Sequence, residues 1–253
     1  MKRREMIRAS SAAIAAAATP LLGRAAQPCP PPFVSAAGGT SATTNCPTSS
    51  SSNYSTGFDT AESPLSEGGR WLHTDSTLTV CKTVGGIAFG TQTGGTYDDS
   101  SAYMTGYGNN HEVEGVVWLN PNAPSTPNRE VELLLRWTDN NPLRSTQYGA
   151  TRATGYEVMW SHIGAYLILG RFKGAELARA NSSAPAPKSG DRFRARIEGQ
   201  RIRAWVNDVV MIDYTDSNTS LQIVSGNPGI GFYIDGGASN TDFGFNSVTV
   251  RAV

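Results

Sequence analysis

The sequence predicts an all-β protein in which short antiparallel strands form a sandwich or a barrel. Three observations support this prediction. Strand-like runs recur along most of the chain, with Gly, Pro, Asn and Asp between them. No segment keeps a helical period of 3.6 residues. The chain has 253 residues and 39% hydrophobic content, which is enough for one sizeable core beside a leader.

The expected strands follow one another from residue 76 to the end of the chain. They are 76–84, 101–107, 111–119, 129–137, 155–160, 165–172, 191–199, 201–207, 209–215, 227–235 and 243–253. The turn at Asn207-Asp208 is compatible with a two-residue hairpin that needs positive φ. Residues 174–181 fit either a helical turn or the continuation of a strand.

Residues 1–26 have the layout of an export signal, with a basic start, an Ala-rich apolar run and small residues at the end. The apolar run is too short and too weakly hydrophobic to span a bilayer of roughly 30 Å. Arg3-Arg4 and the four residues that follow resemble a twin-arginine motif, and an ordinary secretory signal is the alternative. We therefore expect a periplasmic or secreted protein that does not span the membrane.

Residues 27–56 are rich in Pro, Ser, Thr and Gly and are expected to form a flexible arm before a globular part at 57–253. Cys29 and Cys46 lie in this arm, where a disulfide between them is allowed in an oxidising compartment. Cys81 lies in a strand-like run and is expected to be a buried thiol.

The charge balance argues against nucleic acid as a partner. The whole chain has a formal net charge of zero, and the leader holds five of its 21 basic and one of its 21 acidic residues. The mature chain is therefore mildly acidic, and its Lys and Arg form no basic stripe. The alternating arginines of 192–203 are expected to lie on a solvated face, with a platform for an acidic polysaccharide as the alternative.

The C-terminal half carries the motifs of a known family. "GDRFRARIEGQRIRAWVNDVVMIDYTD", "SGNPGIGFYID" and "FGFNSVTV" follow one another in a familiar order, and "LLLRW" with "GYEVMW" is similar to the family's central strands. Together they resemble the concanavalin A-like lectin/glucanase superfamily, particularly laminin-G-like modules of exported bacterial proteins. The resemblance covers roughly residues 57–253 and implies a jelly-roll antiparallel β-sandwich. It does not fix the function, because relatives include lectins, glycan-binding modules, glycosidases and lyases.

The catalytic motifs of these relatives are missing from the sequence. No strand matches the glucanase pattern Glu-x-Asp-x-x-Glu or its shorter form. The alginate-lyase strand Arg-x-Glu-Leu-Arg is echoed by Arg129, Glu132, Leu133 and Arg136, but the spacing differs. The partner motifs of the lyases are also not found.

Period-two alternation divides 111–119, 129–137 and 155–160 into inward and outward sets. If the three runs are neighbours in one sheet, a single outer face holds the carboxylates, an Arg and a Trp: Glu112, Glu114, Trp118, Glu132, Arg136 and Glu157. Sugar rings stack on aromatic side chains, and their hydroxyls bond carboxylates and guanidinium groups. Solvated sheet faces show the same alternation, where charged pairs only set the register.

Three functions are compatible with this face. The leading hypothesis is recognition of a cell-wall or extracellular polysaccharide, with Tyr103 of a nearby Tyr- and Asn-rich segment as a further contact. The second is a polysaccharide-cleaving enzyme, either a glycoside hydrolase or a lyase. Glu114 and Glu132 would then form an acid/base pair, or Arg136 would neutralise a uronate while His162 or Tyr103 moves a proton. The third is a structural or adhesive module.

We expect the protein to be a monomer. Metal binding is a weaker expectation than carbohydrate binding. The resemblance implies that Asp59 and Asn246 meet where the first and last strands pair, beside a calcium site in some relatives. Asn246 replaces the usual acid, and calcium wants several oxygen ligands. The three His are scattered, which disfavours structural zinc.

Overall fold

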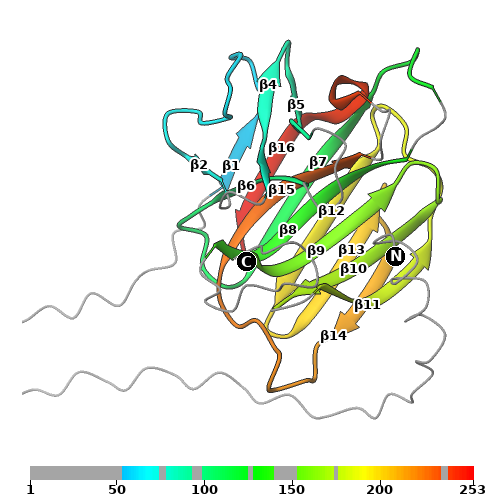
Figure 1. Ribbon diagram of the computed structural model, residues 1–253. Helices are drawn as coiled ribbons and strands as arrows, with labels where there is room; N and C mark the ends of the chain where they lie inside the picture. Colours follow the sequence, from blue (N-terminus) through cyan, green and yellow to red (C-terminus); the bar gives the residue numbers. More distant parts are fainter. Residues whose placement is uncertain are drawn as a thin grey trace, which may run out of the picture. The chain divides into compact units, whose positions relative to one another are not determined.

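The computed structural model describes residues 53–73, 78–92, 99–124, 128–139, 153–173, 176–234 and 239–253. The leader, nearly all of the predicted arm, and Cys29 and Cys46 lie outside these ranges. The described residues form two β-sheets, and their only helical element is a 3-10 turn, η2, at Asn240–Asp242 (Figure 1). None of them forms a helix long and apolar enough to cross a membrane.

The first sheet, sheet I, places the C-terminal strand near its centre. Its order is β14 (Val209–Thr215), β13 (Arg201–Val206), β12 (Arg192–Glu198), β7 (His111–Leu119), β16 (Phe243–Ala252), β5 (Ile87–Phe89) and β4 (Lys82–Val84). β1 (Asn53–Thr56) also pairs with β16. All of these pairs are antiparallel.

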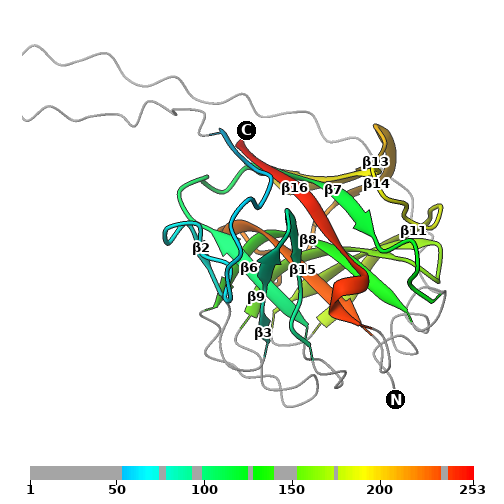
Figure 2. The same ribbon diagram turned by 90° about the horizontal axis from the view of Figure 1, so that it is seen from above.

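The second sheet, sheet II, has β8 at its centre. Its order is β11 (Glu176–Ser183), β10 (Tyr166–Phe172), β9 (Ala153–Ser161), β8 (Arg129–Asp139), β15 (Asn227–Ile234), β6 (Ser100–Met104) and β2 (Trp71–Leu72). The short β3 (Thr79–Val80) joins β6 in the one parallel pair of the described residues. Figure 2 shows the two sheets as stacked layers.

The core fills the space between the sheets and follows the expected alternation. Val131, Leu133 and Leu135 of β8 are buried in the same cluster as Phe193 and Ile197 of β12. Aromatic rings add to this packing, as in the contact of Phe232 with Phe243 and Phe245 at 6.0 and 5.5 Å between centroids. The predicted all-β sandwich of the jelly-roll type is confirmed.

Several local predictions are confirmed as well. Asn207 and Asp208 have φ values of 48° and 66° and join β13 to β14, as a two-residue hairpin requires. The segment with two readings is a strand, since β11 covers Glu176–Ser183. Cys81 is a fully buried free thiol, and its burial raises the pKa of that thiol far above the usual value.

The prediction that 111–119, 129–137 and 155–160 are neighbours in one sheet is wrong. β8 pairs with β9, but β7 lies between β12 and β16 in sheet I. Alternation tells which side of a strand faces the core, and strands of either sheet satisfy it equally well. The predicted single face is therefore divided between opposite sides of the sandwich.

Candidate functional site

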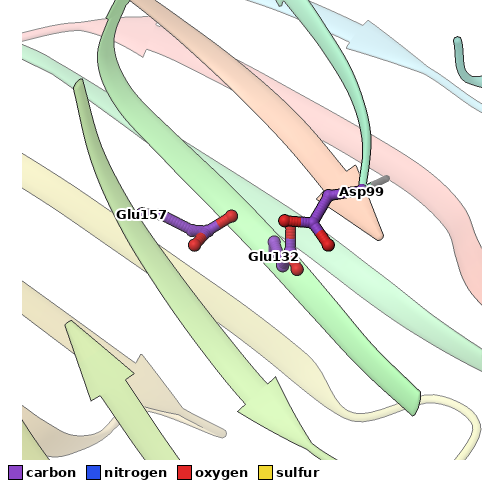
Figure 3. A group of neighbouring side chains, drawn as sticks. All are labelled: Asp99, Glu132 and Glu157. Atoms are coloured by element: carbon purple, nitrogen blue, oxygen red, sulfur yellow. The ribbon is translucent and has the colours of Figure 1, made fainter. Parts of the chain in front are cut away.

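Three carboxylates converge on the outer face of sheet II. Glu132 projects from β8, Glu157 from the neighbouring β9, and Asp99 from the residue that precedes β6. One carboxylate oxygen of each lies within 4.8 Å of the other two (Figure 3). Leu134 pairs with Glu157 and Glu132 pairs with Met159, so the two glutamates are diagonal neighbours across the β8–β9 pair.

A glycine on β15 makes room for this arrangement. Gly231 lies between Glu132 and Ser101 in the register of β8, β15 and β6. A Cβ added at Gly231 would stand 2.4 Å from Oε2 of Glu132 and 3.1 Å from the Ser100 carbonyl oxygen. The Glu132 carboxylate therefore occupies the space above β15 that a side chain would otherwise take.

The cluster is almost inaccessible to solvent. Glu132 and Glu157 are each 1% exposed, and Asp99 is 5% exposed. Carboxylates at this spacing repel one another and lose hydration on burial, so their charge must be balanced by cations, protons or hydrogen-bond donors. The cluster is an ordered part of the fold rather than a solvated row of acids.

The donor set fits a hard cation. Calcium takes six to eight oxygen ligands at about 2.3–2.6 Å, so oxygens that share one ion lie within about 5 Å of each other. The 4.8 Å limit within the cluster agrees with this spacing. Asp99, Glu132 and Glu157 are therefore the residues that would hold calcium on the outer face of sheet II.

The same geometry is compatible with acid/base chemistry. Retaining glycosidases place two carboxyl groups about 5–5.5 Å apart, a spacing that the carboxylates of this cluster approach. Catalysis would also need access for a sugar at both carboxyl groups, and these side chains are nearly closed to solvent. The arrangement thus supplies the groups for such a reaction at a position that is nearly closed to solvent.

The rest of this outer face is largely apolar. Leu134 and Trp137 of β8 are buried with Leu78, Ala153 and Phe172, and the half-buried Tyr103 packs against them. The expected solvated row of β8 is therefore incorrect, because Glu130, Glu132 and Leu134 are all buried. Tyr103, which pairs through its backbone with Leu72 and Gly229, lies at the accessible margin of the face.

Arg136, predicted as a ligand contact, is committed to the protein itself. Its guanidinium group donates hydrogen bonds to the carbonyl oxygens of Asn109 at 2.7 Å, Ile223 at 2.8 Å and Gly199 at 2.6 Å. It also donates to Oδ1 of Asn110 at 3.3 Å. Arg136 is 2% exposed and joins loops at one end of the sandwich. This geometry assigns it a structural role.

Glu112, Glu114 and Trp118 lie on sheet I, away from the cluster. Glu112 forms an ion pair with Arg251 at 2.7 Å, while Glu114 and Trp118 are half-buried. The suggested acid/base pair of Glu114 and Glu132 is not brought together, because the two residues belong to different sheets.

The arginine-rich strands of sheet I are paired with acids, as a solvated face would be. Arg196 and Arg203 both reach Glu198, at 3.0 and 3.4 Å. Arg194 and Arg203 also stack on the Trp205 ring, at 4.4 and 5.2 Å from its centroid. These arginines therefore already have charged or aromatic partners within the protein.

The remaining candidates lie elsewhere in the fold. His162 follows the last residue of β9 and is half-buried, and this burial, together with the charge of Arg129, lowers its pKa. Asp59 and Asn246 are both exposed, and Asn246 occupies a β-bulge of β16. Among the described residues, the acidic cluster is the group with metal-ligand spacing, and it includes neither of them.

Of the three clustered acids, Glu132 and Glu157 were predicted on the outer face, whereas Asp99 was considered only as part of the Tyr- and Asn-rich segment that contains Tyr103. Asp99 belongs to a run of polar residues before β6, and β6 lies beyond β15 from β8. Its proximity to Glu132 depends on sheet order, which alternation does not report. A local pattern in the sequence could not have placed Asp99 beside Glu132.

Comparison with known proteins supports the fold. No protein family's sequence profile matches this chain, and no curated protein matches it. Solved structures do match over most of its length. The VIP36 exoplasmic/lumenal domain in its Ca2+/Man3GlcNAc-bound form is 10% identical, with a TM-score of 0.53, and the match covers 75% of this chain and 86% of that one.

Two further solved structures match with similar sequence identities and TM-scores. One comes from work on endo-acting O-glycanases with which members of the human gut microbiota initiate mucin breakdown. It is 11% identical, with a TM-score of 0.53, and the match covers 79% of this chain and 98% of that one. A galectin-like protein of unknown function from Bacillus subtilis is 9% identical, with a TM-score of 0.51 and coverage of 79% and 94%. At these identities the similarity shows a shared fold and leaves the function open.

Proposed function

We propose that this protein is an exported carbohydrate-binding jelly-roll module that recognises a cell-wall or extracellular polysaccharide. The observation that carries the proposal is the convergence of Asp99, Glu132 and Glu157 from three parts of sheet II. Two of the matched structures come from glycan contexts, one bound to Man3GlcNAc and one from an O-glycanase study. We assign export to residues 1–26, and the mature chain then functions in the periplasm or outside the cell.

The chemistry of the face suits a sugar ligand. Carboxylates accept hydrogen bonds from hydroxyl groups, and a tyrosine offers an apolar ring with a polar tip. Because the carboxylates are buried and Tyr103 is half-buried, a glycan contacts the margin around Tyr103 first. The carboxylates form the inner layer, where a bound cation would orient them and reduce their mutual repulsion.

The test compares isosteric substitutions on the two sheets. Purified wild type, Glu132→Gln and Glu157→Gln are applied to a glycan array, with calcium and with a chelator, and folding is checked by circular dichroism. Glu114→Gln is the matched control, because it makes the same change on sheet I. We expect binding that falls at least tenfold in the first two variants and is unchanged in the control.

Two outcomes would count against the proposal. The first is a wild-type protein that binds no glycan on a broad array in either condition. The second is a loss in Glu114→Gln that equals the loss in Glu132→Gln. If the wild type binds glycan with calcium but not with the chelator, the cluster holds a cation and the carbohydrate proposal stands.

Polysaccharide cleavage is the second candidate, favoured by the short separation of the carboxyl groups. A panel of polysaccharides is incubated with the wild type, and reducing ends and the absorbance of unsaturated uronates are followed. Turnover that disappears in Glu132→Gln and persists in Glu114→Gln would establish an enzyme. Binding without turnover on any substrate would leave the binding module.

A further inference from the structure

A small polar pocket lies at one end of the sandwich, away from the acidic cluster. Its volume is about 170 Å³, and it is lined by Thr138 of β8, Thr154 of β9, Lys173 just after β10, and residues 222–225. Thr138 and Thr154 are register partners. Thr154 is three residues along β9 from Glu157 of the cluster, or roughly 10 Å at the usual rise of a strand, and alternation places the two side chains on opposite sides of sheet II.

Lys173 is the charged group among the described residues that line this pocket, and none of those residues is acidic. Its ammonium group donates to the carbonyl oxygens of Ser220 at 3.3 Å and Gln222 at 3.1 Å. An ammonium group has three donors, so a third remains for a ligand. The hydroxyl groups of Thr138 and Thr154 can donate or accept beside it. The pocket therefore combines one cation with neutral hydrogen-bonding groups.

A buried ionic network adjoins the pocket. Oδ2 of Asp216 accepts hydrogen bonds from the Tyr156 hydroxyl and from Nη1 of Arg171, both at 2.7 Å. Tyr156 is two residues from Thr154, so the two share one side of β9, and Arg171 of β10 is two residues before Lys173. The backbone amide of Ile223, in the pocket wall, donates to the Tyr156 hydroxyl at 3.1 Å.

Among the side chains that the structure describes, this network carries an excess of positive charge. Arg171 and Arg179 both interact electrostatically with Asp216, so the group holds two cations and one anion. Nη2 of Arg171 is buried and makes no hydrogen bond within the described part of the chain. Together with Lys173 in the adjoining pocket, these charges favour the binding of an anion at this end of the sandwich.

We propose that the pocket binds the carboxylate-bearing ring of an acidic sugar. The Lys173 ammonium pairs with the carboxylate, and the two threonines bond ring hydroxyls. The volume is below the roughly 300 Å³ at which pockets for drug-sized ligands begin, which suits a single ring rather than a chain. Val224, which is 60% exposed, gives the rim an apolar contact for the ring's carbon face. This assignment does not depend on the acidic cluster.

The test is a calorimetric titration of the full chain with D-glucuronate and with D-glucose, which differ at the carboxylate. We expect glucuronate to bind at least tenfold more tightly than glucose, and its affinity to fall as salt is raised. Lys173→Met should weaken glucuronate binding at least tenfold, and Lys173→Arg should retain most of it. Lys188→Met, at an exposed turn lysine, is the matched control and should leave binding unchanged.

Three results would overturn the assignment. They are equal binding of glucose and glucuronate, no binding of glucuronate by the wild type, and unchanged binding in Lys173→Met. Thermal unfolding of each variant shows whether a loss reflects the pocket or the fold. The cluster variants of the glycan array test a different site, so either proposal can fail without the other.

Discussion

Acidification is expected to destabilise this protein through one buried histidine. His111 begins β7 and has no exposed surface. Its Nδ1–H donates to the Gly108 carbonyl oxygen at 2.9 Å, and its Nε2 accepts from the backbone amide of Arg136 at 3.1 Å. Burial, and to a smaller extent the charge of Arg136, lowers the pKa of His111 to about 4, although the hydrogen bond to Gly108 opposes this shift.

The sign and size of the effect follow from linkage. In the unfolded chain the imidazole takes up a proton near pH 6.5, whereas in the folded chain it stays neutral until the pH approaches 4. The unfolded state therefore binds more protons over this interval, and stability is lost as the pH falls from 6.5 toward 4. Relative to pH 8, the loss amounts to about 2 kcal/mol at pH 5 and about 3 kcal/mol at pH 4.

Urea unfolding at pH 8, 6.5, 5 and 4.2, followed by tryptophan fluorescence, measures this loss. His111→Gln keeps a donor and an acceptor but does not titrate, so its stability should depend less on pH. The free-energy difference between wild type and variant should shrink by about 2 kcal/mol between pH 8 and pH 5. Carboxylates such as Asp213 and Asp216 contribute equally to both proteins and cancel. A difference that is the same at both pH values would refute the role of His111.

Two further predictions concern residues beside the sites. Gly231→Ala should destabilise the protein by about 1–3 kcal/mol and weaken glycan binding, because its methyl group would displace the Glu132 carboxylate. Gly57→Ala, whose methyl group would make only an ordinary 3.5 Å contact, is the control in both assays. Arg136→Lys should cost about 3 kcal/mol or more in urea unfolding, because several buried carbonyls lose a charged donor, while glycan binding persists. Arg192→Lys, at an exposed ion pair, should change little, and a similar loss there would contradict the argument.

The fold could be predicted because its determinants are local. Alternation in β8, β12 and β13 marks the core side of each strand, and the Asn207-Asp208 turn marks a hairpin. These features depend on a few consecutive residues. The order of strands in each sheet depends on contacts between distant segments, and no local pattern reports it. The prediction therefore failed for β7, whose pattern fits either sheet.

The candidate site was predictable only in part for the same reason. Glu132 and Glu157 belong to strands that are adjacent in sequence and in the sheet, so alternation alone places them on one face. Asp99 joins them across β15, and Gly231 makes the approach possible. The sequence also could not show that this face is buried, because burial depends on what packs over it. The Lys173 pocket combines two strands, the residue that follows a third, and a distant segment, so local patterns do not report it either.

A β-bulge in β8 explains why the strand that most resembles a ligand-binding row does not behave as one. Arg136 and Trp137 together oppose the single residue Gly155, and Arg136 adopts a φ of 49°. The extra residue shifts the alternation, so Trp137 lies on the outer face with Phe172 rather than in the main core. It also turns Arg136 toward the loops that its guanidinium group joins. Strict alternation assumes no bulge, and it therefore wrongly made Arg136 a ligand contact. The acids that precede the bulge are the part of the row that remains a candidate for binding.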